Sequence, residues 1–536
     1  MSGFNNKRFL ITAALPYANG ELHIGGLRST YLPADVFARY CKLRGYETLF
    51  VCATDEHGAP VEINAARAGI PAEEFVKKFR PKHRKDFSDA GVVFDSFHYT
   101  HSDEDRRLSE EFFEALKAGG YIFKKNVMQT YCPKCARVLP DRYVKGVCPN
   151  CGTHDQYGDY CEKCGKTYTT DDLVTPYCAL CNGVPEKQEV EHFFFKLSAF
   201  KPFFEQWFSE NKELQPDVVN YLRNWLKDLQ DWDITRDGPY FGIPIPGAKE
   251  QYFYVWFDAP IGYIASAKAW CDSQGEDLRK WWSDETEIVH FIGKDIVYHH
   301  YLFWPAMLKG AKWALPKRMP ARGYLNVEGE KMSKSRGTFI LLSDFTRKFR
   351  PDYLRYYLTA VTPNNSSDGN FSWHEFGQRV NNELIDSYGN LVNRVLTFIY
   401  NKHDAVIPIT NDFTDEDKAF EEEISVMLDE TAKSYEAVEL KTALEKALAF
   451  SGRANKYFND GAPWKKKEHA PTVLLLSARA VYALSVALHP IIPFSTQNVF
   501  KCFGTEPKWG GSIAAGSKIN KPELLFAKIE DGQLKL

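Results

Sequence analysis

Eight of the twelve cysteines in this 536-residue chain occur as four C-x-x-C pairs between residues 132 and 181. A C-x-x-C turn presents two thiolates to one metal ion, and four thiolates make a closed tetrahedral zinc site. Four pairs therefore predict two structural zinc sites. The short loop between the second and third pairs favours joining them, which leaves the first and fourth pairs for the other site. The pairs are Cys132/Cys135, Cys148/Cys151, Cys161/Cys164 and Cys178/Cys181.

The composition is that of a folded chain without a strong overall charge. The net charge is only −3, so any contact with nucleic acid has to be local. The N-terminus lacks the pattern of a secretory signal, and we expect a cytoplasmic protein, in which disulfides are disfavoured. The longest apolar run, 473–488, contains Arg479 and is too short for a bilayer span, so it predicts a buried core helix and no membrane contact.

Short apolar runs alternate with amphipathic helical patterns on both sides of the cysteine-rich segment. This order predicts an α/β fold with a parallel sheet, with "QYFYVWFDAP" and "TEIVHFIGKDIV" among its expected strands. From about Gln378 onward the apolar residues recur at helical spacing, which predicts an all-α domain. The expected divisions are 1–120 for the first half of the α/β domain, 121–191 for the zinc-binding insertion, 192–322 for the rest of the insertion and the second half, 323–377 for a connector, and 378–536 for the helical domain.

Two stretches far apart in the sequence look complementary. In "LPYANGELHIGGL" (15–27) a strand feeds a helix through a turn rich in glycine, and such a helix start binds anions. Neither the dinucleotide fingerprint nor the P-loop is present there. In "EGEKMSKSRG" (328–337) a loop flanked by glycine carries Lys331 and Lys334, whose ammonium groups suit the charge of a triphosphate. Each stretch alone is weak evidence, but both together on an α/β frame are specific.

These two elements resemble the "HIGH" turn and the "KMSKS" loop of class I aminoacyl-tRNA synthetases. Further stretches are similar to the methionyl-tRNA synthetases, and they run from Ala14 to Trp464, over most of the chain. They are "ALPYANG", "CATDEHG", "WFDAPIGY", "FIGKDIVYHHYLFWPA", "GNLVNR" and "APW". The resemblance implies a Rossmann-type doubly wound parallel sheet with a zinc-knuckle insertion and an all-α anticodon-binding domain. It also implies activation of L-methionine by ATP to methionyl-adenylate and pyrophosphate, followed by transfer of methionine to tRNA(Met).

The resemblance assigns residues to the nucleotide. The catalytic set it implies is His23, Gly25, Gly26, Lys331 and Lys334, acting on ATP with Mg²⁺. The ATP-binding set is Tyr17, His23, Gly293, Asp295 and Lys334, with the carboxylate of Asp295 accepting from the ribose. Gly26 stands where the family's motif has its second histidine, and we expect its N–H or a water to take that place.

The resemblance also assigns a methionine pocket. Asp55 corresponds to the anchor of the substrate's ammonium group, and the pocket walls are Ala14, Leu15, Tyr17, Trp256, Ala259, Pro260, Tyr263, Ile296 and His300. His299 stands where relatives can carry another aromatic residue, and we expect it to alter the pocket floor. A thioether gains from contacts between sulfur and aromatic rings, which suits the tryptophan and tyrosine. No role is assigned to His57.

The helical domain is expected to read the CAU anticodon through Asn390, Arg394 and Trp464. Asn390 and Arg394 are four residues apart and so share a helix face, and a tryptophan offers a stacking surface. The short insertion leaves no room for a large hydrolytic editing domain, and the chain ends without an added dimerisation domain, so a monomer is expected. The alternative from another class is a catalytically inactive, synthetase-like tRNA-binding protein. An adenylyltransferase for a small molecule fits the zinc insertion and the helical domain poorly.

Overall fold

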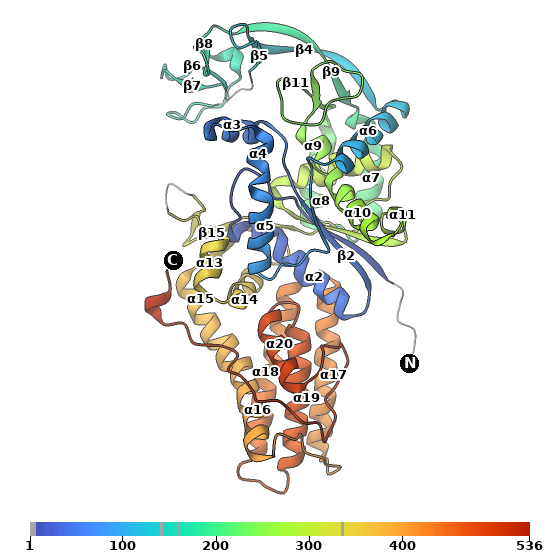
Figure 1. Cartoon of the computed structure of the whole chain (residues 1–536), viewed down its shortest axis with the longest axis vertical. Coiled ribbons are helices and arrows are strands. Elements are labelled where there is room, and N and C mark those ends of the chain that lie inside the picture. The colour runs from blue at the N-terminus through green and yellow to red at the C-terminus, as the bar shows by residue number, and fades with distance from the viewer. Residues whose placement is uncertain (1–6, 140–142, 159, 334–336, 536) are drawn as a thin grey trace.

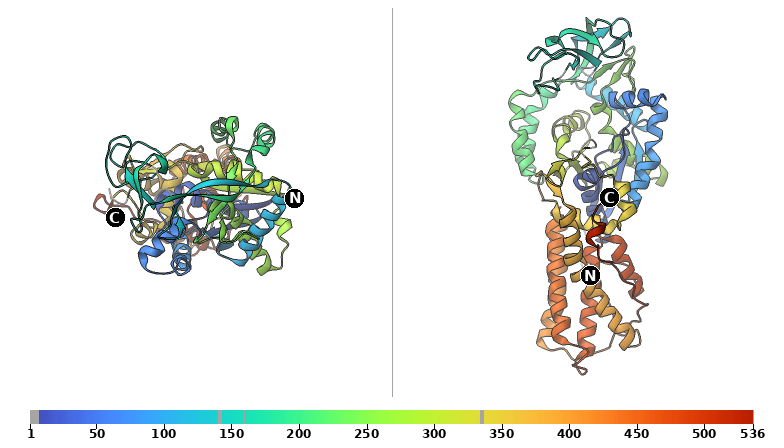
Figure 2. Two further views of the ribbon diagram at one scale, coloured as in Figure 1. Left: turned by 90° about the horizontal axis from the view of Figure 1, so that it is seen from above. Right: turned by 90° about the vertical axis from the view of Figure 1, so that its left-hand side faces the viewer.

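The structure is a computed structural model that describes residues 7–139, 143–158, 160–333 and 337–535. The molecule is elongated, with the cysteine-rich insertion at one end, the α/β domain in the middle and a helical bundle at the other end (Figure 1). A view from the side shows the same order along the long axis (Figure 2).

The α/β domain is built on a five-stranded parallel sheet in the order β14-β13-β1-β2-β3. Alternate residues of β1 enter opposite cores, because Phe9 and Ile11 belong to one apolar cluster and Leu10 to the other. The chain runs outward from β1 in one direction and returns to its other side as β13, so the order reverses between these strands. The predicted doubly wound sheet is confirmed. Its strands are β1 (Arg8–Ala13), β2 (Glu47–Thr54), β3 (Ser96–Tyr99), β13 (Thr286–Gly293) and β14 (Ala321–Arg322).

Helices cover both faces of this sheet. The first helix is continuous, because α1 passes through a π-helical turn, Leu27–Tyr31, into α2. One strand prediction was wrong in part, since within "QYFYVWFDAP" only Gln251–Phe253 is a strand and Val255–Asp258 is a helix. A short, fully apolar run does not distinguish a buried strand from a buried helix. The helices are α1 (Ile24–Gly26), α2 (Leu32–Leu43), α3 (Ala59–Ala68), α4 (Ala72–Lys77), α5 (Phe79–Asp89), α6 (Asp103–Ala118), α9 (Val255–Asp258), α10 (Ile261–Gln274), α11 (Leu278–Trp281) and α12 (Trp304–Gly310).

The insertion is carried by a long antiparallel ribbon. Strands β4 and β9 pair from Ile122↔Phe195 to Tyr131↔Glu186, and the cysteine-rich knuckles lie at the far end of the ribbon. The returning chain forms two helices and then pairs again with the base of β9 through β10. Its elements are β4 (Ile122–Cys132), β5 (Arg137–Val138), β6 (Val144–Val147), β7 (Gln156–Tyr157), β8 (Val174–Cys178), β9 (Glu186–Phe195), α7 (Lys201–Glu210), α8 (Pro216–Leu222), β10 (Trp232–Asp233), β11 (Thr235–Asp237) and β12 (Gln251–Phe253).

The connector and the helical domain share one apolar core with one face of the sheet. A single helix runs from Trp373 through a π-helical segment, Val380–Gly389, to Lys402, so the division expected at 378 falls inside it. The connector holds β15 (Leu325–Val327), β16 (Glu330–Lys331), α13 (Leu342–Lys348), α14 (Pro351–Val361) and β17 (Gly369–Phe371). The domain holds α15 (Trp373–Arg379), α16 (Asn390–Lys402), α17 (Asp415–Glu436), α18 (Leu440–Gly461), α19 (Ala470–Leu488) and α20 (Pro493–Phe503).

The apolar helix α19 begins at Ala470, three residues earlier than the run noted in the sequence, and by length and composition it could cross a membrane. Its most apolar window is 89% buried inside the protein, where it packs against α16, α17, α18 and α20. The prediction of a buried core helix is therefore confirmed.

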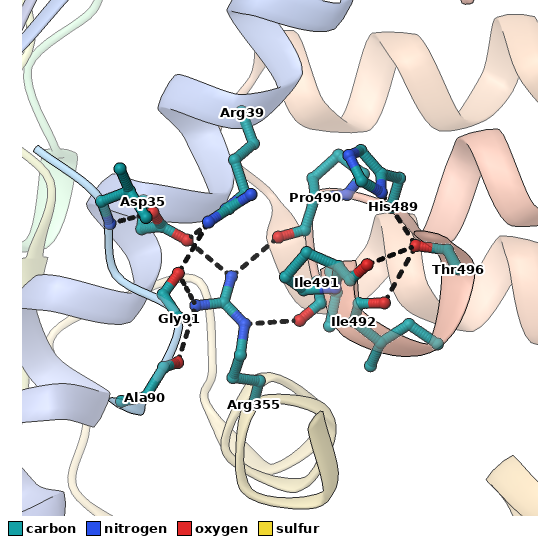
Figure 3. A network of polar contacts seen from close by, with 12 residues as sticks. Asp35, Arg39, Ala90, Gly91, Arg355, His489, Pro490, Ile491, Ile492 and Thr496 are labelled. Carbon is teal, nitrogen blue, oxygen red and sulfur yellow. Dashed lines mark hydrogen bonds and ion pairs between the residues drawn. The ribbon is translucent and has the colours of Figure 1, made fainter. Parts of the chain in front are cut away.

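The bundle is fastened to the α/β domain by the side chain of Arg355, on α14 (Figure 3). The guanidinium is fully buried and donates to the carbonyl oxygens of Pro490 and Ile491, in the turn between α19 and α20. It also donates to the carbonyl oxygens of Ala90 and Gly91, which follow α5. One side chain thus bridges the α/β domain and the helical bundle.

Candidate active site and metal centres

A cavity of about 1010 Å³ opens at the carboxyl edge of the sheet, beside the ends of β1 and β13. This is the switch point of a doubly wound sheet, where ligands bind in such folds. Lys334 lies outside the described residues. Every other residue assigned from the sequence to catalysis, ATP or methionine lines this one cavity: Ala14, Leu15, Tyr17, His23, Gly25, Gly26, Asp55, Trp256, Ala259, Pro260, Tyr263, Gly293, Asp295, Ile296, His300 and Lys331.

The glycine-rich turn and the lysine loop are joined through the backbone. Ile24 N donates to Ile340 O at 3.1 Å, and Leu342 N donates to Leu22 O at 2.9 Å. A Cβ on Gly25 would come within 2.9 Å of Met332 Sδ, so a side chain at this position would displace the Met332 side chain of the lysine loop. The glycine therefore permits the close approach of the two motifs.

His23 caps the first helix from inside the cavity. Its Nδ1 accepts from the backbone N–H of Gly26 at 3.3 Å, so the neutral ring carries its proton on Nε2. The backbone N–H of Gly26 thus points at His23, whereas the sequence led us to expect this N–H to contact the nucleotide. The imidazole is held as a hydrogen-bond donor at a helix N-terminus, which suits a phosphate oxygen.

Gly293 and Asp295 line the cavity at the end of β13. A Cβ on Gly293 would lie 2.4 Å from Asp295 Oδ1, so only glycine leaves room for that carboxylate. Lys331, on β16, also lines the cavity, and its side chain is exposed. The ammonium of Lys331, the imidazole of His23 and the carboxylate of Asp295 thus line the same cavity.

Asp55 has an unsatisfied carboxyl oxygen in the same cavity. Its Oδ1 is buried and has no hydrogen-bond partner among the described residues. Burial, and next the nearby Asp258, raise the pKa of Asp55 well above its ordinary value. A buried carboxylate oxygen without a partner is costly, and a ligand's ammonium group would satisfy it.

The walls beside Asp55 are aromatic and uncharged. His300 Nδ1 donates to Ile296 O at 3.1 Å, so its Nε2 accepts from the hydroxyl of Tyr263 at 2.8 Å. Burial lowers the pKa of His300 to about 4, which keeps the ring neutral. His299 does not itself line the cavity but stacks on Trp256, which does, with 3.8 Å between ring centroids.

The cysteines form two groups of four, with the pairing that the loop length favoured. The sulfurs of Cys132 and Cys181 lie 3.4 Å apart, and those of Cys135 and Cys178 lie 3.9 Å apart. In the second group the separations are 3.8 Å for Cys148–Cys164 and 3.6 Å for Cys151–Cys161. Zinc–sulfur bonds of about 2.3 Å place tetrahedral sulfurs roughly 3.8 Å apart, so both groups fit a zinc ion.

The backbone conformation after each C-x-x-C pair also fits two zinc sites. The residue that follows the second cysteine of every pair has a positive φ, at Ala136, Gly152, Gly165 and Asn182. This turn also aims N–H groups at sulfur, since Gly183 N lies 3.4 Å from Cys181 Sγ and Cys164 N lies 3.4 Å from Cys161 Sγ. Such donors stabilise thiolates around a metal.

The residues expected to read an anticodon gather at the side of the bundle. Trp464 is 44% exposed, and the guanidinium of Arg394 lies 5.7 Å from its ring centroid. Arg394 also donates to Asn459 Oδ1 at 2.6 Å and lies over Phe458. Asn390 is exposed one turn away on the same helix.

Several residues near the cavity were missed in the sequence. Gln129, Arg137 and Tyr143 reach the cavity from the insertion, and no motif marked them. Asp258 was quoted within "WFDAPIGY" but given no role, and its Oδ2 lies 2.5 Å from Nδ1 of His57. An aspartate beside a histidine in space but 201 residues away leaves no local signal.

A doubly wound sheet, a histidine–glycine turn backbone-paired to a lysine loop over one cavity, and an appended helical bundle together define a class I aminoacyl-tRNA synthetase. A family model described as tRNA synthetases class I (M) matches residues 9–396, and one described as the anticodon binding domain of methionyl tRNA ligase matches residues 407–535. The chain belongs to the methionyl-tRNA synthetase family.

Similar proteins cover nearly the whole chain. Methionine–tRNA ligase of Methanosphaera stadtmanae is 40% identical over 99% of this chain and 82% of its own length. The ligase of Methanopyrus kandleri is 41% identical over 98% of this chain and 81% of its own. Among solved structures, Mycobacterium tuberculosis methionyl-tRNA synthetase bound by methionyl-adenylate has a TM-score of 0.82 at 25% identity, over 97% of this chain and 100% of that chain.

Proposed function

We propose that this protein is a methionine–tRNA ligase, which activates L-methionine with ATP and transfers it to tRNA(Met). The observation that carries the proposal is one cavity lined both by an unsatisfied carboxyl group, Asp55, with the neutral Tyr263–His300 pair, and by His23 with Lys331. The first set fits an amino acid with an uncharged side chain, and the second fits a triphosphate.

In the first step the substrate's carboxylate attacks the α-phosphorus of ATP, and pyrophosphate leaves. The carboxylate is already ionised at neutral pH, so this step needs positioning and charge stabilisation more than a general base. Asp55 holds the ammonium group, His23 donates Nε2–H to a phosphate oxygen, and Lys331 and Lys334 neutralise the departing pyrophosphate. Mg²⁺ on the ATP phosphates would share that charge.

In the second step a hydroxyl of the terminal adenosine of tRNA attacks the carbonyl carbon of the adenylate, and AMP leaves. The chain's part is to keep the adenylate in place, with Gly293 and Asp295 at the nucleoside and the Tyr263 wall at the side chain. Anticodon reading by Asn390, Arg394 and Trp464 brings the correct tRNA, since stacking and a cation suit unpaired bases.

Selection of methionine follows from the wall chemistry. Tyr263 commits its proton to His300, and the ring of Trp256 is held by stacking on His299. A flexible thioether gains roughly 0.3–1.5 kcal/mol per contact with an aromatic ring. The same walls have to reject homocysteine, because we assign no separate hydrolytic site to this chain.

We also propose that each group of four cysteines holds one zinc ion, which fixes the end of the insertion. All four ligands of each site are thiolates, so zinc has a structural role here.

The test is charging of tRNA bearing a CAU anticodon with labelled methionine and ATP. The proposal expects methionine esterified to the tRNA. The alternative, an inactive tRNA-binding protein, expects the tRNA to be bound without being charged.

A further inference from the structure

His192, on β9 at the base of the insertion ribbon, is held between two carboxylates. Its Nδ1 lies 2.8 Å from Asp233 Oδ2, and its Nε2 lies 2.7 Å from Asp237 Oδ2. The side chain is only 1% exposed. A neutral imidazole can donate from one nitrogen only and would turn a lone pair toward the other carboxylate. The side-chain amide nitrogen of Gln129 also lies 3.0 Å from His192 Nε2, but a carboxylate at hydrogen-bond distance from each ring nitrogen favours the doubly protonated imidazolium.

The charged surroundings of His192 agree with this form. Arg236 lies 4.0 Å from Asp233, so the two carboxylates face two cations. From β4, Lys125 is in register with His192, and its ammonium lies over the ring of Phe194 at 5.4 Å. Although burial lowers the pKa of His192, Asp233 and Asp237 together raise it to about 9.

The two carboxylates belong to the segment that leads into the methionine wall. Asp237 and Arg236 line the cavity, and the guanidinium of Arg236 stacks over Tyr254 at 4.0 Å. Tyr254 N donates to Ile234 O at 2.9 Å, which ties this segment to the residue just before α9. Helix α9 carries Trp256. A short path of contacts thus leads from the insertion ribbon through His192, Arg236 and Tyr254 to helix α9.

We propose that His192, as a buried imidazolium, is a positioning residue that locks the zinc-bearing ribbon to the β10–β11 segment and so fixes the methionine wall. The inference rests on the proposed function, because it assigns that wall to methionine. His192 contacts no substrate, and it acts through Asp237, Arg236 and Tyr254. Its loss leaves two carboxylates facing each other without their shared cation, and the segment before Trp256 shifts.

The experiment compares wild type with His192→Gln in ATP–pyrophosphate exchange driven by methionine. The KM for methionine is expected to rise roughly tenfold or more, the factor for one lost charge-assisted hydrogen bond, with the KM for ATP unchanged. The matched control is His154→Gln, an exposed histidine of the same insertion, for which both KM values stay at wild type.

The pH profile separates positioning from a general loss of structure. A raised pKa means that the contribution of His192 is full below about pH 6.5 and is lost as the pH rises through about 9. The ratio of the variant's KM to the wild-type KM should therefore fall toward one above pH 9. The titration of methionine's own amine cancels in this ratio.

Three results would overturn the inference. The first is an unchanged KM for methionine in His192→Gln, the second is a ratio that stays constant across pH 7 to 10, and the third is a parallel rise in the KM for ATP. Absence of methionine-dependent exchange in the wild type would instead refute the proposed function.

Discussion

Arg355 of α14 and Asp35 of α2 form a buried ion pair, with 2.6 Å between Nη2 and Oδ2 and side-chain exposures of 0% and 1%. Asp35 lies on the same continuous helix that begins beside His23, so the pair ties the helix of the active site to the bundle. Arg39 also reaches Asp35, at 2.8 Å, and Val93 N donates to its other oxygen at 3.0 Å.

Replacement of this arginine should destabilise the whole protein. Arg355→Met removes the donor that Asp35 and four carbonyl groups share, although Arg39 still reaches Asp35 and Gly91 O. Breaking a buried pair typically costs about 3–5 kcal/mol. Thermal unfolding should show a clearly lower midpoint. Arg347→Met is the control, because that side chain is 76% exposed, and its midpoint should change little. Equal unfolding midpoints for the two variants would contradict the role of Arg355 in holding the bundle to the α/β domain.

The stabilisation by the Arg355–Asp35 pair should depend on pH in acid. Burial raises the pKa of Asp35, but Arg39 and Arg355 outweigh it and hold the pKa below its ordinary value. The pair's contribution is therefore full above about pH 4 and is lost as the pH falls below that value. The wild-type advantage over Arg355→Met should shrink in acid.

Metal analysis should find about two zinc ions per chain. The double variant Cys151→Ser/Cys164→Ser should keep about one, because the other group of four is separate. A content of one or none in carefully purified wild type would refute the two-site assignment.

Lys334→Ala should lower the maximal rate of pyrophosphate exchange while the KM for methionine changes little. Loss of one electrostatic contact to a developing charge typically costs roughly 2.7–4 kcal/mol, about a hundredfold to a thousandfold in rate. Lys309→Ala, on the exposed side of α12, is the control. An exchange rate equal to that of the control would remove Lys334 from the mechanism.

Trp464→Ala should weaken tRNA charging and leave pyrophosphate exchange intact. Stacking on a base is worth about 1–3 kcal/mol, so kcat/KM for tRNA should fall by roughly ten to a hundredfold. Trp225→Ala is a matched control, since both tryptophans are 44% exposed and Trp225 lies in the insertion's helical part. Parallel losses of charging and exchange in Trp464→Ala would indicate a packing role and reject the anticodon assignment.

The sequence predicted what depends on local pattern. The C-x-x-C spacing, the strand before His23 and the helical period after Gln378 each express a rule over a few residues, and the zinc groups, β1 and the bundle follow them. Asp55 was found only through a resemblance, because a single aspartate after a strand has no distinctive pattern.

Long-range pairings could not be predicted in this way. His192 meets Asp233 and Asp237 across 41 and 45 residues, and Arg355 meets Asp35 across 320. Such contacts depend on how strands and helices are placed, and periodicity carries no information about that placement. Apolar runs were ambiguous for the same reason, since burial made "YVWFDAP" look like a strand where Trp256 lies on a helix.

The most direct test is ATP–pyrophosphate exchange with each of the twenty amino acids in turn. An unpaired Asp55 beside a neutral aromatic wall predicts exchange with L-methionine far above that with leucine, isoleucine or glutamine. It also predicts loss of that exchange in Asp55→Asn, with ATP binding retained. Exchange that is absent with methionine, or equal with another amino acid, would contradict the account.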